Sequence, residues 1–396
     1  MGTTRLNAKE KFPSKGGRKL EDLFLTDEQK MMRHTVRKFI QNDVLPIEQT
    51  IGALAAEVPE EYVVSLQEKA KQMGFWQMWA IPEWGGGGLD IFSRTVVMEE
   101  ASRHRFGLMC PGLNAFGQEI PSVVMKSPSP QTEKMMKPAI ASGAGCFLSI
   151  DSSSNFIARR EGNNGWRISG RQRFVANADK AAVGLIWAKM DGPEDTGLFL
   201  VENDKRIRSE PTVVMRTIRL FNVSLEDYQA PADSCLGNGK ERVGELLPEL
   251  QILLAARCLG IAQEALRLGT EYATRRETFG KLLEKREAIQ DMVADSVVAL
   301  ESARLLTWAT AKKQSLGKAS AEEVAMAKLS ATETALRIVD QMIQIHGGMG
   351  ITQEVVLERW YRELRLTRIQ LVPSEIIRQK LALANFQKYH APQSRP

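Results

Sequence analysis

Two short stretches in the last third of the chain have residue types that could bind a pyrophosphate next to a flat apolar ring. They are residues 276–281, Arg-Glu-Thr-Phe-Gly-Lys, and residues 344–350, Gln-Ile-His-Gly-Gly-Met-Gly. An arginine beside a tight Phe-Gly-Lys corner can present a planar, bidentate fork to a pyrophosphate, and Phe279 can cover a ring. Gly347 and Gly348 let a backbone approach a ligand without Cβ clashes.

The same residues also have a plainer interpretation, in which Arg276 pairs with Glu271 or another acid and the glycines cap a helix. The cysteines, the histidines and the glycine-rich run do not indicate a further reactive or ligand-binding site. The four cysteines and four histidines lack the spacing of metal ligands, so we predict reduced thiols and no metal site. The run Gly85–Gly88 is not followed by the Lys-Ser/Thr of a phosphate loop, so it predicts a turn.

The composition is that of an ordinary globular protein. The chain has 396 residues, of which 43% are apolar, and its net charge of +5 comes from 53 basic and 48 acidic residues. Two or three domains are therefore expected, and nucleic acid is not the default partner. No apolar run approaches the roughly 20 residues of a membrane-spanning helix. Residues 1–24 are basic without an apolar segment, which predicts a frayed arm on a cytoplasmic protein; a mitochondrial presequence, and so the mitochondrial matrix, is the alternative.

The patterns that must position the two stretches change twice along the chain. Residues 25–138 show apolar side chains at helical spacings, and Thr26 supplies the cap of a first helix. Residues 139–238 contain short runs rich in β-branched and aromatic residues, separated by turn signals, as antiparallel strands do. Long amphipathic helices return over residues 239–390, and residues 391–396 form a tail. The prediction is an α+β protein in the order helical, β, helical.

The two stretches, at this spacing and in this order of domains, closely resemble the acyl-CoA dehydrogenase family of flavoproteins. Residues 358–363, Glu-Arg-Trp-Tyr-Arg-Glu, follow the second stretch and strengthen the resemblance, which covers about residues 25–390. It implies an N-terminal helical domain, a small antiparallel β domain and a C-terminal four-helix bundle. It also implies FAD, which the family holds across a subunit interface with residues that correspond to Arg276, Phe279, Gln344, Gly347 and Gly348.

A family dehydrogenase uses a carboxylate to remove the α-proton of an acyl thioester while the β-hydrogen leaves as hydride to the flavin. The resemblance places the usual base at Leu371 and the base of a minority of members at Leu250. Neither leucine can take a proton. Glu249 adjoins the second position and is the candidate base, although one helical step turns a side chain by roughly 100° from its neighbour. The alternative is an exposed glutamate near the start of a helix.

The residues expected to contact the flavin ring depart from the family pattern. The strand expected against the ring is residues 174–176, Phe-Val-Ala, where the family has a threonine in place of Ala176. The hydroxyl-bearing segment before it retains only a serine cluster, Ser152–Ser154. On this side, the resemblance leaves Phe174 and Glu375 as residues expected to contact the cofactor.

The resemblance predicts a FAD-dependent acyl-CoA dehydrogenase-like oxidoreductase that acts on an acyl thioester, by α,β-dehydrogenation or by a variant reaction with a non-standard base. The expected partners are acyl-CoA or another acyl thioester, electron-transfer flavoprotein, and further copies of the chain in a homodimer or tetramer. Two alternatives stay open. The chain could be a catalytically degenerate subunit that assembles with an active paralogue, or a repurposed fold without bound flavin.

Overall fold

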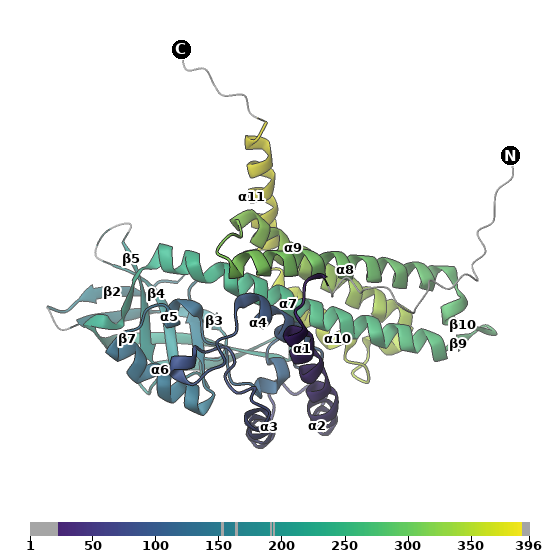
Figure 1. Cartoon of the computed structure of the whole chain (residues 1–396), viewed down its shortest axis with the longest axis horizontal. Coiled ribbons are helices and arrows are strands. Elements are labelled where there is room, and N and C mark those ends of the chain that lie inside the picture. Colours follow the sequence, from purple (N-terminus) through teal and green to yellow (C-terminus); the bar gives the residue numbers. More distant parts are fainter. Residues whose placement is uncertain (1–22, 152–153, 163–164, 191, 193–194, 390–396) are drawn as a thin grey trace, which may run out of the picture.

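The order helical, β, helical is confirmed by the computed structural model, which describes residues 23–389 except 152–153, 163–164, 191 and 193–194. The predicted arm, residues 1–24, lies almost wholly outside the described residues, as does the tail. Figure 1 shows the β domain at one end of the molecule and the long C-terminal helices extending to the other end. No helix in the described part of the chain is long and apolar enough to cross a membrane.

The N-terminal part is a set of helices around an apolar core. α1 (Asp27–Phe39) begins with the predicted cap, in which the Thr26 hydroxyl accepts a hydrogen bond from the Gln29 amide. The predicted turn at Gly85 is also present, at φ +86 after the short helix η3 (Pro82–Trp84). The other helices are η2 (Ile40–Val44), α2 (Leu45–Thr50), α3 (Glu60–Gln72), α4 (Ile91–Ala101), η4 (Pro111–Asn114), α5 (Ser122–Met125) and α6 (Pro130–Ser142).

The β domain is built on one eight-stranded sheet with the order β6-β7-β3-β2-β4-β5-β8, and β1 pairs with β4 beside this path. Most neighbouring strands run antiparallel, as predicted, whereas β4 runs parallel to both β1 and β2. Phe147, Phe199 and Phe221 lie in the core of this domain. The strands are β1 (Cys146–Ser149), β2 (Ile157–Arg160), β3 (Gly165–Val175), β4 (Val183–Lys189), β5 (Thr196–Glu202), β6 (Ile207–Val214), β7 (Ile218–Pro231) and β8 (Cys235–Asn238).

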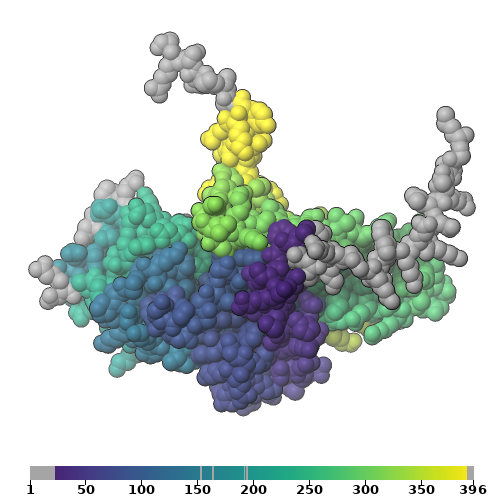
Figure 2. Space-filling model, viewed as in Figure 1, coloured from purple at the N-terminus to yellow at the C-terminus, as the bar shows by residue number. Residues whose placement is uncertain are grey.

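The C-terminal part is the predicted bundle of long helices. Its members are α7 (Gly239–Arg275), α8 (Glu287–Ser315), α9 (Ala321–His346), α10 (Leu357–Thr367) and α11 (Ser374–Gln387), with the short helices η6 (Leu283–Lys285) and η7 (Gly347–Ile351). Leu259, Ile338 and Trp360 lie in the bundle core. α7 also packs against α4, which ties the bundle to the N-terminal part. α11 projects from the body of the molecule (Figure 1, Figure 2).

Candidate functional site

The first stretch forms a small hairpin beyond the end of α7. β9 (Glu277–Thr278) and β10 (Lys281–Leu282) pair antiparallel, and Phe279 and Gly280 form the turn between them at φ +51 and +71. A type I′ turn needs positive φ at both central residues, and Phe279 and Gly280 both adopt it. The Phe279 side chain is 99% exposed. The hairpin therefore presents an aromatic ring to whatever approaches this end of the bundle.

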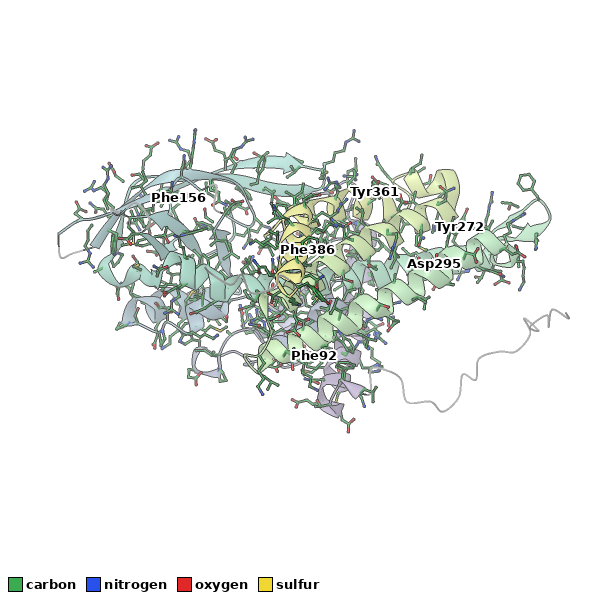
Figure 3. All side chains as sticks on the ribbon, turned by 90° about the horizontal axis from the view of Figure 1, so that it is seen from above. Phe92, Phe156, Tyr272, Asp295, Tyr361 and Phe386 are labelled. Atoms are coloured by element: carbon green, nitrogen blue, oxygen red, sulfur yellow. The ribbon has the colours of Figure 1, made fainter. Side chains whose placement is uncertain are left out.

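The second stretch lies at the same end of the bundle. α9 ends at His346 because Gly347 takes φ +60 and ψ −139, a conformation that glycine alone adopts readily. A Cβ on Gly347 or Gly348 would meet no atom within 4 Å, and Gln344 is exposed. The Tyr272 ring of α7 stacks on His346 with ring centroids 4.3 Å apart; Figure 3 labels Tyr272 far from Phe156 of the β domain. The structure thus places the two stretches at the same end of the bundle.

Arg276 follows α7 directly and is exposed. Within the described part of the chain, no carboxylate lies within 4.0 Å of its guanidinium. Glu271 pairs instead with Arg267 at 2.6 Å and with Arg275 at 4.0 Å, so the alternative prediction of an Arg276–Glu271 pair is wrong. The free guanidinium fork is what a pyrophosphate needs.

We call these five predicted cofactor residues the bundle-end surface: Arg276, Phe279, Gln344, Gly347 and Gly348. They combine a cation without an acidic partner, two backbones open to close approach and a protruding ring. This surface fits the pyrophosphate and adenine half of FAD.

The strand expected against the flavin ring is the end of β3. Phe174 lies there at φ +62 with its side chain 49% exposed, and the Arg173 guanidinium is 4.6 Å from its ring centroid. The side chains of Gln118 and Asn177 hydrogen-bond each other at 2.7 and 3.0 Å. Two of the predicted serines, 152 and 153, lie outside the described residues. Residues 174–177 offer the flavin ring no uncommitted polar side chain, so this half fits FAD poorly.

The resemblance places the usual base position in the connection between α10 and α11, residues 368–373. Leu371 takes φ +62 and is 38% exposed, so an apolar side chain stands at the position that the resemblance assigns to the base. Glu375 is exposed in the first turn of α11. Figure 1 places α11 well away from the β9–β10 hairpin, so this connection does not belong to the bundle-end surface.

Glu249 lies inside α7 and is 5% exposed. Its Oε1 accepts a hydrogen bond from Arg94 Nη1 at 2.7 Å, and its Oε2 accepts one from the Ser122 amide at 3.1 Å. The alternative prediction of an exposed glutamate near a helix start is wrong, because α7 already begins at Gly239 and buries this side chain against α4. Leu250 is half-buried in an apolar cluster. Both carboxylate oxygens of the candidate base are therefore committed within the chain.

Arg94 connects Glu249 to a row of alternating charges. It also lies 3.5 Å from Glu119, which in turn pairs with Arg257 of α7. Burial alone would lower the pKa of Arg94, but the carboxylates of Glu249 and Glu119 outweigh it and raise that pKa. We call these four residues the ion-pair quartet. Sequence reasoning missed it, although one arginine in the otherwise uncharged run 91–98 was a signal.

Comparison with known proteins establishes the family. Models of the N-terminal and C-terminal domains of acyl-CoA dehydrogenases match residues 26–144 and 237–384. A human protein named short-chain specific acyl-CoA dehydrogenase, mitochondrial, is 33% identical over 383 residues, which cover 91% of this chain and 90% of the human protein. The chain therefore belongs to the acyl-CoA dehydrogenase family.

Solved structures share the fold at lower sequence identity. A butyryl-CoA dehydrogenase from Megasphaera elsdenii matches with a TM-score of 0.81 at 22% identity, over 91% of this chain and 99% of that one. A glutaryl-CoA dehydrogenase from Mycobacterium smegmatis in complex with FADH2 matches with a TM-score of 0.81 at 21% identity, over 94% of this chain and 97% of that one. These likenesses confirm the fold.

Proposed function

We propose that the chain is a subunit of a FAD-dependent acyl-CoA dehydrogenase-type oxidoreductase, in which it supplies the bundle-end surface to a flavin whose ring lies in a catalytic paralogue. One observation carries this proposal: both oxygens of Glu249 are committed, to Arg94 and to the Ser122 amide. The other two base positions are Leu371 and Leu250. A base for the α-proton therefore has to come from another subunit.

The two halves of the proposed cofactor site are far apart within one chain. α7 starts at the β domain and ends at the hairpin; its 37 residues span roughly 55 Å at the α-helical rise. The bundle-end surface would hold the pyrophosphate with Arg276 and cover the adenine with Phe279. When bound, FAD supplies the hydride acceptor. Asn177, three residues after Phe174, bonds Gln118, and the adjacent Glu119 pairs with Arg257 near the middle of α7. About half of α7, roughly 27 Å, therefore separates the β3 end from the hairpin, so a second subunit has to complete each site.

Purification of the tagged chain from the cells that make it tests this proposal. Native mass spectrometry should find a mixed oligomer with a paralogue that retains the carboxylate base. An acyl-CoA oxidation assay with a dye as electron acceptor should then lose turnover when the paralogue's base is changed to glutamine. A homo-oligomer of this chain that oxidises acyl-CoA by itself contradicts the proposal.

A homo-oligomeric enzyme with Glu249 as its own base is the second candidate function. The burial of this carboxylate next to Leu250 favours it. Glu249→Gln would then abolish turnover, because glutamine cannot take a proton. Glu264→Gln is the matched control, since Glu264 is another buried α7 glutamate that pairs with arginines, Arg103 and Arg267. Equal activity of both variants, per folded protein, would exclude Glu249 as the base.

The remaining partners follow from the proposed reaction. We propose acyl-CoA as the substrate carrier and electron-transfer flavoprotein as the electron acceptor. The proposed compartment is the cytoplasm, with the mitochondrial matrix as the alternative. Replacing the dye by electron-transfer flavoprotein in the same assay tests the acceptor, since turnover should continue with it as the sole oxidant.

A further inference from the structure

A lysine lies buried in the C-terminal part beneath the connection between α10 and α11. Lys328 of α9 is 0% exposed, and its Nζ donates a hydrogen bond to the backbone oxygen of Val372 at 2.9 Å. Among the residues described, no carboxylate lies within 4.0 Å of this ammonium. Burying an ammonium without an ion-pair partner is unfavourable, and an apolar side chain of similar volume would pack α9 without that cost. The hydrogen bond to the Val372 oxygen is the one interaction that an apolar side chain at position 328 could not make.

The same helix also holds the other end of this connection, residues 368–373. Glu333 of α9 lies 2.8 Å from Nε of Arg368 and 3.2 Å from Nη2 of Arg378. Lys328 therefore holds the end that precedes α11, and Glu333 holds the end that follows α10. Both contacts come from one long helix that is packed in the bundle core.

The connection has a backbone shape that its sequence does not favour. Leu371 has φ +62, and the Val372 amide donates to the Gln370 oxygen at 2.8 Å, which makes a tight turn. A non-glycine residue in the left-handed region persists only where its surroundings impose it. The two contacts from α9 are such surroundings, since they fix the residues on either side of Leu371.

We propose that Lys328 and Glu333 are positioning residues that clamp residues 368–373 and hold the side chain at position 371 at one fixed point beside α11. Only the significance of position 371 rests on the proposed function, because the clamp acts on the backbone of the connection. In the family pattern this position carries the base, so the clamp preserves the geometry of a base site in a chain whose residue there is leucine.

The strength of the hydrogen bond from Lys328 to the Val372 oxygen depends on the charge of Lys328. Burial lowers the pKa of Lys328 to about 8. The charged and titratable groups that face it are Cys258 from α7, Glu333 from α9, Arg368 from the connection and Glu375 from α11. Burial raises the pKa of Cys258 to about 12, so that thiol stays neutral over this range. A neutral amine is a weaker donor than an ammonium, so the hold weakens between about pH 7 and about pH 9.

Hydrogen exchange of the full chain, read by mass spectrometry on peptides that cover residues 368–374, tests the clamp. In Lys328→Met, the amides of Val372 and Ser374 should exchange about tenfold faster than in the wild type, because a charge-assisted hydrogen bond is lost. The thermal midpoint should not fall, since methionine removes a buried charge. Lys318→Met, at an exposed lysine in the turn before α9, is the control and should leave this exchange unchanged.

Glu333→Gln and the wild-type protein give independent readouts. The glutamine variant should accelerate exchange at Ile369, next to Arg368. After correction for the intrinsic pH dependence of amide exchange, opening of the connection should rise from about pH 7 to about pH 9 in the wild type and stay constant in Lys328→Met.

Equal amide exchange rates in Lys328→Met and the wild type would overturn the proposal. An opening of the wild-type connection that does not change between about pH 7 and about pH 9 would overturn it as well. A uniform loss of protection along α9 in the variant also overturns it, because Lys328 would then stabilise the whole helix and not the connection in particular. None of these measurements uses flavin or acyl-CoA, so failure of the clamp and failure of the proposed function are distinguishable.

Discussion

The bundle-end surface and the ion-pair quartet both contain arginines, but the fold uses them differently. Arg276 is exposed and has no acidic partner in the described part of the chain, whereas Arg94 is buried between Glu249 and Glu119. A cation without an internal partner is available to a ligand, whereas a cation held between two buried carboxylates is committed to the fold. The difference supports the proposal that Arg276 is available to a cofactor, whereas Glu249, next to a predicted base position, is committed to the core.

The largest effect should come from breaking the ion-pair quartet. Arg94→Met leaves Glu249 with no cation, so we expect the free energy of unfolding to fall by about 3–5 kcal/mol, the usual cost of removing one partner from a buried pair. Urea unfolding followed by circular dichroism measures the loss. Arg275→Met, at an exposed arginine of α7, is the control. A loss below about 1 kcal/mol for Arg94→Met would mean that the quartet is not part of the core.

A second buried cluster, around Glu100, should give the protein its acid sensitivity. Burial raises the pKa of Glu100, but Arg37, Arg33 and Arg103 outweigh it and hold that pKa at about 2. Because this folded-state pKa lies below the ordinary value of 4.5, the stabilisation is complete above about pH 5 and is lost as pH falls toward 2. The full shift corresponds to about 3 kcal/mol. Urea unfolding at a series of pH values should show this loss, and Glu100→Gln should flatten it.

Arg276→Ala should separate binding from stability. We expect FAD to bind the assembled oligomer about tenfold more weakly, since one charge-assisted contact to a phosphate is lost. The free energy of unfolding should change by less than about 0.5 kcal/mol, because the side chain is exposed. Fluorescence titration of FAD measures the affinity. Arg275→Ala, one residue earlier, should change neither quantity, and an equal loss of affinity in both variants would remove the assignment of Arg276.

The smallest effect is expected for Phe279→Ala. The ring is almost fully exposed, so stability should stay within about 0.5 kcal/mol of the wild type. FAD affinity of the assembled oligomer should fall about threefold to tenfold, the range of one aromatic stacking contact. Unchanged affinity, in the same fluorescence titration, would show that the hairpin serves a purpose other than covering the cofactor.

The fold could be predicted from the sequence because its signals are local. The Thr26 cap, the Gly85 turn and the change from helical to strand spacing each depend on a few neighbouring residues. The tight corner at Phe279 and Gly280 and the end of α9 at Gly347 could be predicted for the same reason, whereas the role of these residues toward a cofactor comes from the resemblance and stays a prediction.

The interior of the site could not be predicted, because it depends on contacts between distant segments. Glu249 matched the pattern of an exposed helical glutamate, and only the packing of α4 on α7 brings Arg94 to it. Lys328 likewise has a residue type that is ordinarily exposed, and its burial follows from the path of the connection between α10 and α11. A single sequence carries no direct signal for either contact.

We propose that this chain retains one half of a FAD site. The most direct test is the visible absorption spectrum of the chain purified alone and titrated with FAD, beside its native mass. We expect flavin uptake far below one equivalent per chain, with full occupancy only when a catalytic paralogue is added. Flavin bands at one equivalent per chain in a homo-oligomer would contradict this proposal and would favour Glu249 as the base.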